Sequence, residues 1–161
     1  MTILKKNIKL LIIIFILLGL SFNFNPVNAA AGSGDSAGDD QKSLYKSGEK
    51  LIKRAKKLEK KGKNEKAEKL YLKAYKKLEK AYAKNKKSAD ILNYLGYTLR
   101  KTGNFEKAEE FYLKGLELDA GHLGINEYLG ELYVQTSRIE LAKERLQVLK
   151  SCKCEEYDEL K

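Results

Sequence analysis

Redox, metal and acid–base chemistry in this 161-residue chain would rest on Cys152, Cys154 and His122, its only two cysteines and its only histidine. Two cysteines separated by one residue can bridge to each other, exchange with another thiol, pair between molecules or ligate a metal. Zinc sites usually need more ligands than these three residues supply, so a Cys/His site would be incomplete. In an oxidising compartment a local disulfide is the default. We expect one between Cys152 and Cys154, with redox exchange, intermolecular pairing and metal binding as the alternatives.

Catalytic groups are otherwise missing from the sequence. There is no nucleophile–base–orienter set, no Gly-rich phosphate loop and no pair of carboxylates fixed in an obvious cleft. Glu155 and Glu156 are neighbours and would point in different directions on a helix. His122 follows Asp119 in a turn, where we expect a turn or helix-capping role. The sequence therefore predicts a protein that is not an enzyme and that carries no cofactor or metal.

The first 29 residues have the pattern of a cleaved secretory signal peptide. Lys5, Lys6 and Lys9 precede an apolar run of 11 residues at 10–20, followed by small residues around Ala29. Such a run is short for a membrane-spanning helix, which needs about 20 residues. We expect export and cleavage after Ala29, with an uncleaved N-terminal anchor as the alternative. No cysteine lies at the cleavage site, so a lipoprotein anchor is not indicated.

The rest of the chain divides into a short leader and a helical domain. Residues 30–42 are small, Gly/Ser-rich and acidic, and such a segment cannot bury enough apolar surface to offset the entropy of ordering it. We therefore expect a flexible leader there. Residues 43–161 contain no proline and are rich in Lys, Glu, Leu, Ala and Tyr, which favours helix throughout.

Charge is distributed unevenly along the helical domain. Residues 42–87 hold 19 Lys and Arg against 5 Asp and Glu, a net charge of +14, whereas residues 88–161 hold 10 against 14, a net charge of −4. The lysines could be a solvated face that keeps the protein soluble, or a contact for an anionic polymer or membrane surface. Association of the basic front of one copy with the acidic back of another is a third interpretation. Nucleic-acid binding is disfavoured by the predicted export.

Helix ends are marked by small and capping residues. Glycines at 62 and 103 indicate breaks, and Ser88 is placed to cap the helix that follows it. Ser137 and Glu140 have the spacing of a capping box. We expect Asn64 and Asn104 to act as N-caps. The expected helices cover residues 65–84, 89–101, 105–118 and 125–135, and the expected hairpins cover residues 43–86, 88–119 and 123–151, with a short tail at 155–161.

A repeat of 34 residues runs through the second half of the domain. Leu95-Gly96-Tyr97 is matched by Leu129-Gly130-Glu131, and Ala108 by Ala142. This period is typical of stacked helical hairpins, in which small residues let the helices approach closely. A divergent first unit aligns with the second at a spacing of 41, and we assign the seven extra residues to a longer second helix ending near Lys86.

Residues 89–122 resemble a tetratricopeptide repeat (TPR), with Leu in place of the frequent Trp at 92. Residues 123–156 resemble a second such repeat, in which Ser137 replaces the turn glycine. The resemblance implies an all-α fold, a short right-handed α-solenoid of about three TPR hairpins with a brief closing element. The implied units are 43–87, 88–122 and 123–156, with the closing element at 155–161. The implied structural positions are Leu95, Gly96, Gly103, Ala108, Tyr112, Leu129, Gly130 and Ala142.

The C-terminal half also resembles a subgroup of small exported bacterial TPR proteins. In these, two cysteines precede a Glu-Glu-Tyr-x-x-Leu element, as Cys152 and Cys154 do here, although the cysteines of the subgroup are further apart. This resemblance implies a periplasmic interaction protein without enzymatic activity.

In TPR folds the first helix of each hairpin lines a concave groove. The resemblance therefore implies a scaffold or adaptor that binds a protein or peptide there; the alternative is an envelope-associated protein that binds a polyanion or membrane surface through its Lys-rich first hairpin. A closing element as short as 155–161 cannot cover the last hairpin fully. This predicts either marginal stability or coverage of that hairpin by a partner or by a second copy of the chain, so a homo-oligomer is one possible assembly. The residues that the resemblance places in the groove are Ile52, Lys56, Asn93, Tyr97, Arg100, Glu127, Glu131 and Val134. As an alternative, these side chains could simply face water.

Overall fold

The computed structural model describes residues 34–161, which form seven α-helices and no β-strand. The predicted signal peptide (1–29) and the first residues of the predicted leader (30–33) lie outside the described residues. None of the described helices has the length and apolar character needed to span a bilayer. The helices are α2 (Gly34–Glu59), α3 (Asn64–Lys84), α4 (Ala89–Lys101), α5 (Phe105–Leu118), α6 (Leu123–Gln135), α7 (Ile139–Leu149) and α8 (Glu155–Leu160).

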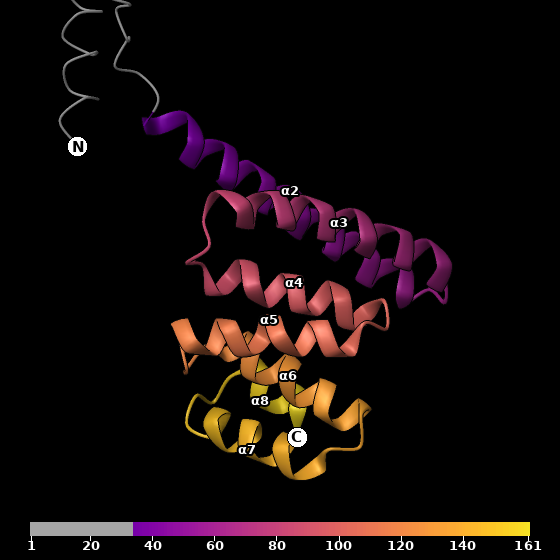
Figure 1. Ribbon diagram of the computed structural model, residues 1–161. Helices are drawn as coiled ribbons and strands as arrows, with labels where there is room; N and C mark the ends of the chain where they lie inside the picture. Colours follow the sequence, from indigo (N-terminus) through magenta and orange to yellow (C-terminus); the bar gives the residue numbers. More distant parts are fainter. Residues whose placement is uncertain (1–33) are drawn as a thin grey trace, which may run out of the picture. The chain divides into compact units, whose positions relative to one another are not determined.

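The helices pair into three hairpins that stack in chain order (Figure 1). Each hairpin packs its second helix against the first helix of the next, so that α3 contacts α4 and α5 contacts α6. The first helices also contact one another, α2 with α4 and α4 with α6, and α8 follows as the last member of that row. The prediction of an all-α array of three hairpins with a closing element is confirmed.

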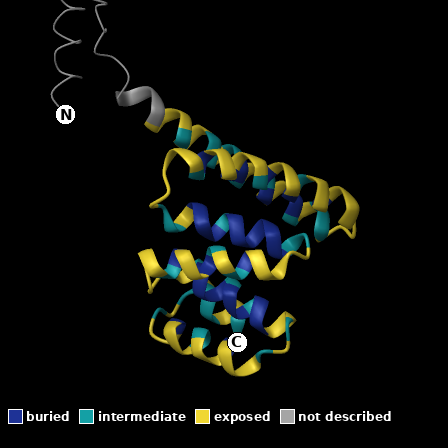
Figure 2. Ribbon diagram, in the orientation of Figure 1, coloured by how far each residue is buried: buried dark blue, intermediate teal, exposed yellow. Residues whose placement is uncertain are grey.

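Small residues decide how closely the helices approach. Ala108 is fully buried, Ala142 nearly so, and the ring of Tyr112 is fully buried against the face of α4 that carries Gly96. Burying such apolar surface drives the stacking, because none of the three hairpins can cover its own apolar face. Helix α4 lies at the centre of the array and is buried along most of its length (Figure 2).

The first hairpin is longer than the others, as the spacing of 41 predicted. Helix α3 has 21 residues and α5 has 14, so the seven extra residues do lengthen the second helix, which ends at Lys84 rather than Lys86. Helix α2 begins at Gly34, so residues 34–42 are helical and the predicted leader is wrong for that part. Asp40 forms an ion pair with Lys84 at 2.8 Å, and acidic residues near a helix N-terminus are favoured by the helix dipole.

The turn within each hairpin needs a residue in the left-handed region. Gly62 has φ of 68°, Gly103 has φ of 81°, and Ser137 has φ of 60° at the equivalent place. The predicted capping box of Ser137 and Glu140 is therefore wrong: α7 has Arg138 at its N-cap with no side-chain cap bond, and Glu140 pairs with Lys143 instead. The repeat geometry takes precedence over the local capping signal.

Helix N-caps follow the sequence only in part. The Ser88 hydroxyl accepts a hydrogen bond from the backbone N–H of Ile91, and His122 caps α6 by accepting at Nδ1 from the backbone N–H of Ile125, as its predicted turn role required. Asn104 occupies the N-cap of α5 without a side-chain bond. Asn64 is the first residue of α3, one position after the N-cap.

We expect Ser137→Gly to raise the free energy of unfolding by about 0.5–1 kcal/mol, because glycine adopts positive φ without the steric cost that a serine bears. The reciprocal change Gly103→Ala should lower it by about 1 kcal/mol for the same reason. Urea denaturation followed by circular dichroism measures both. Equal effects of the same sign at the two turns would contradict this account.

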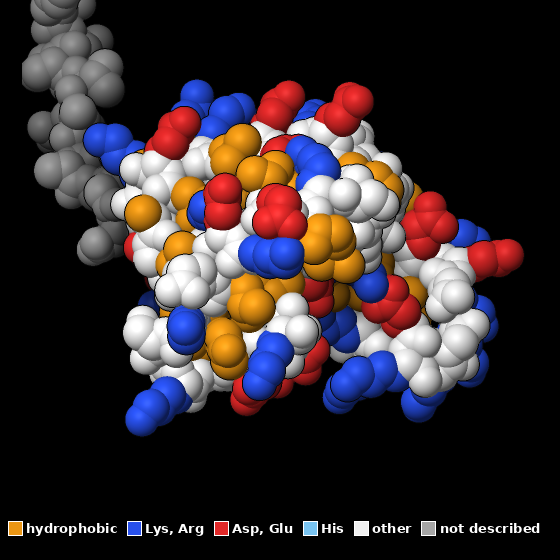
Figure 3. Space-filling model, turned by 90° about the horizontal axis from the view of Figure 1, so that it is seen from below, with side chains coloured by type: hydrophobic (Ala, Val, Ile, Leu, Met, Phe, Trp, Pro, Cys, Tyr) orange, Lys and Arg blue, Asp and Glu red, His pale blue; other side chains and the backbone are white. Residues whose placement is uncertain are grey.

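The last hairpin exposes apolar side chains that a further repeat would cover. Ile139, Leu141 and Val148 of α7 are 46%, 36% and 40% exposed. Figure 3 views the molecule from below Figure 1, where α7 lies, and shows hydrophobic side chains gathered among charged ones on this face. Helix α8 packs mainly on α6 and leaves this face open, consistent with a closing element too short for the whole hairpin.

Candidate functional site

The first helices of all three hairpins line a single cavity of about 810 Å³, and α8 forms its far end. Because α2, α4 and α6 are neighbours in the stack, side chains one or two turns apart on each helix face the same space. The lining residues are Lys56, Glu59, Lys60, Tyr97, Arg100, Lys101, Glu127, Tyr128, Glu131, Val134, Gln135, Glu155, Glu156, Glu159 and Leu160.

The middle of the cavity is aromatic. The rings of Tyr97 and Tyr128 lie 4.7 Å apart between centroids, and the Lys56 ammonium lies 4.9 Å from the Tyr97 ring and donates to the Tyr128 hydroxyl at 3.2 Å. The Arg100 guanidinium lies 5.4 Å from the Tyr97 ring. Burial raises the pKa of Tyr97 and of Tyr128, so both phenols stay neutral. These cation–π and hydrogen-bond contacts tie three helices together, and because Tyr97 is only 3% exposed, the aromatic surface that reaches the cavity is mainly that of Tyr128.

At the cavity, two ion pairs cross between neighbouring hairpins. Lys101 of α4 pairs with Glu59 of α2 at 2.6 Å, and Arg100 of α4 pairs with Glu131 of α6. The Arg100 side chain is only 4% exposed, and its Nε has no hydrogen-bond partner in the described part of the chain. A buried guanidinium that keeps one donor unmatched is costly, and Arg100 lies beside the fully buried Tyr112, whose hydroxyl also lacks a hydrogen-bond partner in the described residues.

Charge changes sign along the cavity. The cations Lys56, Lys60, Arg100 and Lys101 come from α2 and α4 and form what we term the basic wall. At the other end, α6 and α8 supply the acidic wall, which consists of Glu127, Glu155, Glu156 and Glu159. Burial, together with the nearby carboxylates of Glu131, Glu156 and Glu159, raises the pKa of Glu127 to about 8, and Lys56 opposes this rise. A substantial fraction of Glu127 is therefore protonated at neutral pH.

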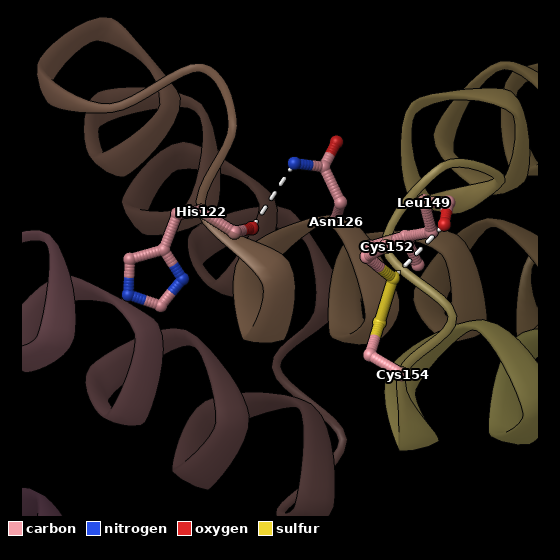
Figure 4. Close-up of a disulfide and its surroundings, with 5 residues drawn as sticks. All are labelled: His122, Asn126, Leu149, Cys152 and Cys154. Atoms are coloured by element: carbon pink, nitrogen blue, oxygen red, sulfur yellow. Dashed lines mark hydrogen bonds between the residues drawn. A yellow bond between two sulfur atoms is a disulfide. The ribbon is translucent and has the colours of Figure 1, made fainter.

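Helix α8 is placed by one apolar contact and by a short linker. A Cβ added at Gly130 would lie 2.7 Å from Cδ1 of Leu160, so the missing side chain of Gly130 makes room for Leu160 on α6. Just before α8, the sulfurs of Cys152 and Cys154 are bonded, with Cα atoms 5.2 Å apart, and Cys154 is the N-cap (Figure 4). The linker thus holds the acidic helix against the end of the cavity.

Six of the eight groove residues implied by the sequence line this cavity, namely Lys56, Tyr97, Arg100, Glu127, Glu131 and Val134. The other two do not. Ile52 is 2% exposed in the core between the first two hairpins. Asn93 is 7% exposed, and its amide Nδ2 lies 2.7 Å from where a Cβ of Gly124 would be. Glycine at 124 lets α6 close over Asn93, which removes it from the cavity.

Sequence reasoning missed several lining residues for two different reasons. Lys60, Lys101 and Gln135 share the repeat register of 41 and then 34 residues, so the period alone could have found them. Glu59 shares the register of Arg100 and Val134 and could have been found in the same way, whereas the residues in register with Tyr128 do not line the cavity. The α8 residues lie outside the repeat register, and no sequence signal places them in the cavity.

The arrangement is suited to binding. Within residues 34–161, no group of three or more His, Cys, Asp or Glu side chains is placed to hold a metal ion. His122 lies outside the cavity and bonds Asp90 at 3.2 Å. An open cavity with an aromatic middle and walls of opposite charge can hold a polypeptide segment by apolar contact and by charge complementarity.

Comparisons with known proteins agree with this geometry. Residues 50–120 match a family model described as Tetratricopeptide repeat. Among solved structures, the type III secretion translocator chaperone SycD of Yersinia enterocolitica is 18% identical, with a TM-score of 0.55 over 76% of this chain and 83% of SycD. The second TPR domain of human RPAP3, solved with an HSP70 peptide, is 17% identical, with a TM-score of 0.50 over 74% of this chain and 93% of that domain. No curated protein sequence matches this chain significantly.

Proposed function

We propose that this chain, whose residues 50–120 match the tetratricopeptide repeat family model and whose fold is that of tetratricopeptide repeat proteins, is a non-catalytic interaction module that binds a peptide or helix of a partner protein in the cavity lined by α2, α4 and α6. The observation that carries the proposal is the cavity itself: about 810 Å³, built from all three hairpins, with an aromatic middle and charged walls. That volume lies within the range of about 300–1,000 Å³ typical of ligand sites.

Two further observations support the proposal. A segment laid along the cavity would contact the exposed Val134 and the half-buried Tyr128, in the manner of a helix or strand docked in a groove. The human RPAP3 domain, which has the same fold, is solved with a bound peptide. The pattern of residues 1–29 supports an exported, periplasmic location, and a mature N-terminus at Ala30 would be its direct test by mass spectrometry.

A second candidate function rests on the exposed lysines of the first hairpin. Lys69, Lys73 and Lys76 are exposed and lie outside the cavity, on α3, the second helix of the first hairpin. Such a surface would attract anionic headgroups or cell-wall polymers, and raised salt would weaken that attraction. Reversing these three charges should abolish binding to anionic vesicles under this alternative and should leave capture of a groove partner unchanged under the leading proposal.

A photo-crosslinking amino acid at Val134 should capture a partner protein in cells, whereas the same amino acid at Leu113 should not. Both side chains are exposed, 49% for Val134 and 44% for Leu113, but only Val134 lines the cavity. Adducts resolved by gel and mass spectrometry provide the measurement. Adducts of equal yield at both positions, or none at Val134, would refute the groove proposal.

A further inference from the structure

The acidic wall of the cavity has no cation of its own. In the described part of the chain, Glu59 and Glu131 each pair with a cation, but none of the four carboxylates of the acidic wall forms an ion pair or a side-chain hydrogen bond. The cavity is lined by four cations and six carboxylates, although the whole chain carries a formal net charge of +10. Negative charge is thus gathered at one end of the cavity against the overall charge of the protein.

Glu127 is the centre of this wall and is the most unusual of the four. Glu127 is only 8% exposed and lines the cavity. Its carboxylate has no hydrogen-bond or ion-pair partner within residues 38–161. Burial of the residue and the lack of a bonded cation disfavour the charged form, so Glu127 stays largely protonated at neutral pH until a cation is brought to it. The carboxylates of Glu131, Glu156 and Glu159 lie near enough to disfavour its charge further.

Three of the four cations of the basic wall are already engaged, and the fourth, Lys60, comes from α2 at the opposite end of the cavity and does not affect the pKa of Glu127. Lys56, the nearest cation that favours the charge of Glu127, donates to the Tyr128 hydroxyl and faces two tyrosine rings. Arg100 pairs with Glu131 and Lys101 pairs with Glu59. Docking of α8 adds three more carboxylates beside Glu127, held by Leu160 in the space above Gly130. The group that would balance this end of the cavity must therefore come from another molecule.

We propose that a lysine or arginine side chain of a partner polypeptide binds at the α6–α8 end of the cavity, against Glu127, Glu156 and Glu159. This inference rests on the proposed function and gives the partner a polarity: its basic residue lies at the acidic wall, and the segment runs from there over Tyr128 and Tyr97 toward Lys60. An ammonium or guanidinium group has several donors and can be shared by carboxylates from two helices.

A metal ion is a poorer fit for the same wall. Divalent ions need oxygen ligands converging at about 2–2.6 Å, and no group of three carboxylates in the described residues converges in that way. A long, flexible lysine or a planar arginine side chain makes no such demand, because its hydrogen bonds can reach carboxylates that stand apart.

The test uses two fluorescently labelled peptides, tetra-lysine and tetra-glutamate, and the full mature chain. Fluorescence anisotropy at physiological salt should show that tetra-lysine binds more tightly than tetra-glutamate, despite the positive net charge of the protein. The double variant Glu127→Gln, Glu156→Gln should weaken tetra-lysine binding by about tenfold or more, because it removes two of the three carboxylates that would hold the cation. The control variant Glu117→Gln, Glu144→Gln removes two exposed carboxylates outside the cavity and should change binding less than about twofold.

The outcomes separate this inference from the proposed function. Tighter binding of tetra-glutamate, or equal weakening by the control variant, overturns the inference. Binding of Mg²⁺ or Ca²⁺ alone that is lost in Glu127→Gln, Glu156→Gln also overturns it, since a metal would then be the occupant. If tetra-lysine does not bind but the crosslinker at Val134 still captures a partner, the proposed groove function is retained. Only the inference that a basic residue of the partner lies at the acidic wall is then rejected. Thermal unfolding of each variant checks that binding is not lost through unfolding.

Discussion

Gly96→Val should lower the free energy of unfolding by about 2–4 kcal/mol, measured by urea denaturation with circular dichroism. A Cβ at Gly96 would lie 2.5 Å from Cε1 and 2.7 Å from Cδ1 of Tyr112. The Tyr112 ring is fully buried between α4, α5 and the next hairpin, so it cannot move aside without opening the core. Valine adds further atoms to the same contact and is also a poorer helix former than alanine.

The control is Gly130→Ala, at the same repeat position one unit later, compared with Gly96→Ala, which adds the same single Cβ. There the added Cβ would meet Leu160, a half-buried side chain of the six-residue α8 at the end of the chain. Leu160 and α8 can move away at little cost to the three hairpins, so the loss should stay below about 1 kcal/mol. Hydrogen exchange should show α8 released in Gly130→Ala alone. If both glycines cost the same, the two sites are not distinguished by the mobility of their neighbours.

This contrast between equivalent positions shows what repeats reveal in a sequence and what they conceal. The period of 34 predicted the hairpins because Leu95, Ala108 and Tyr112 recur at places where helices must bury apolar surface. The same period predicted that Gly96 and Gly130 mark close approach. It could not say what approaches, because the Tyr112 ring belongs to the same repeat and Leu160 comes from a helix outside it.

For the candidate site too, the repeat predicted which positions line the cavity but not how neighbouring helices pack against them. Lys56, Tyr97 and Glu131 follow from counting along the first helices, since residues of one register line one face of the stack. Asn93 was misplaced because a single glycine at 124 lets α6 approach it more closely than the register implies. Contacts of that kind depend on how neighbouring helices settle, and no single segment of the sequence specifies them.

Helix α8 gives the cavity its asymmetry. It occupies the place that the first helix of a fourth hairpin would take beside α6, but it has six residues where α4 and α6 have 13 each. It therefore leaves the apolar face of α7 open while bringing Glu155, Glu156 and Glu159 into the cavity. A helix that mainly sealed the core would present more apolar residues, so the composition of α8 suits a role at the site.

The ionisation of Glu127 should make the protein less stable as pH rises from about 5 to about 9. The pKa of Glu127 is about 8 in the folded protein, against 4.5 for an ordinary glutamate. Between these values the folded state holds a proton that the unfolded state has lost, so the free energy of unfolding falls with rising pH, and the loss is complete above the folded pKa. Each pKa unit corresponds to about 1.4 kcal/mol, but the cavity admits water, so we expect a total of about 2–4 kcal/mol.

Glu127→Gln should remove this dependence, because glutamine keeps the shape of the protonated side chain and cannot ionise. The variant should match the parent protein at pH 5 and exceed its free energy of unfolding by about 2–4 kcal/mol at pH 9, as measured by urea denaturation at both pH values. Other groups titrate over this range, so the informative quantity is the difference between variant and parent. Glu117→Gln, which alters an exposed carboxylate outside the cavity, should leave that difference near zero. A difference for Glu127→Gln that does not grow with pH would mean that its carboxylate is solvated, and the acidic wall would then have no unmet need for a cation.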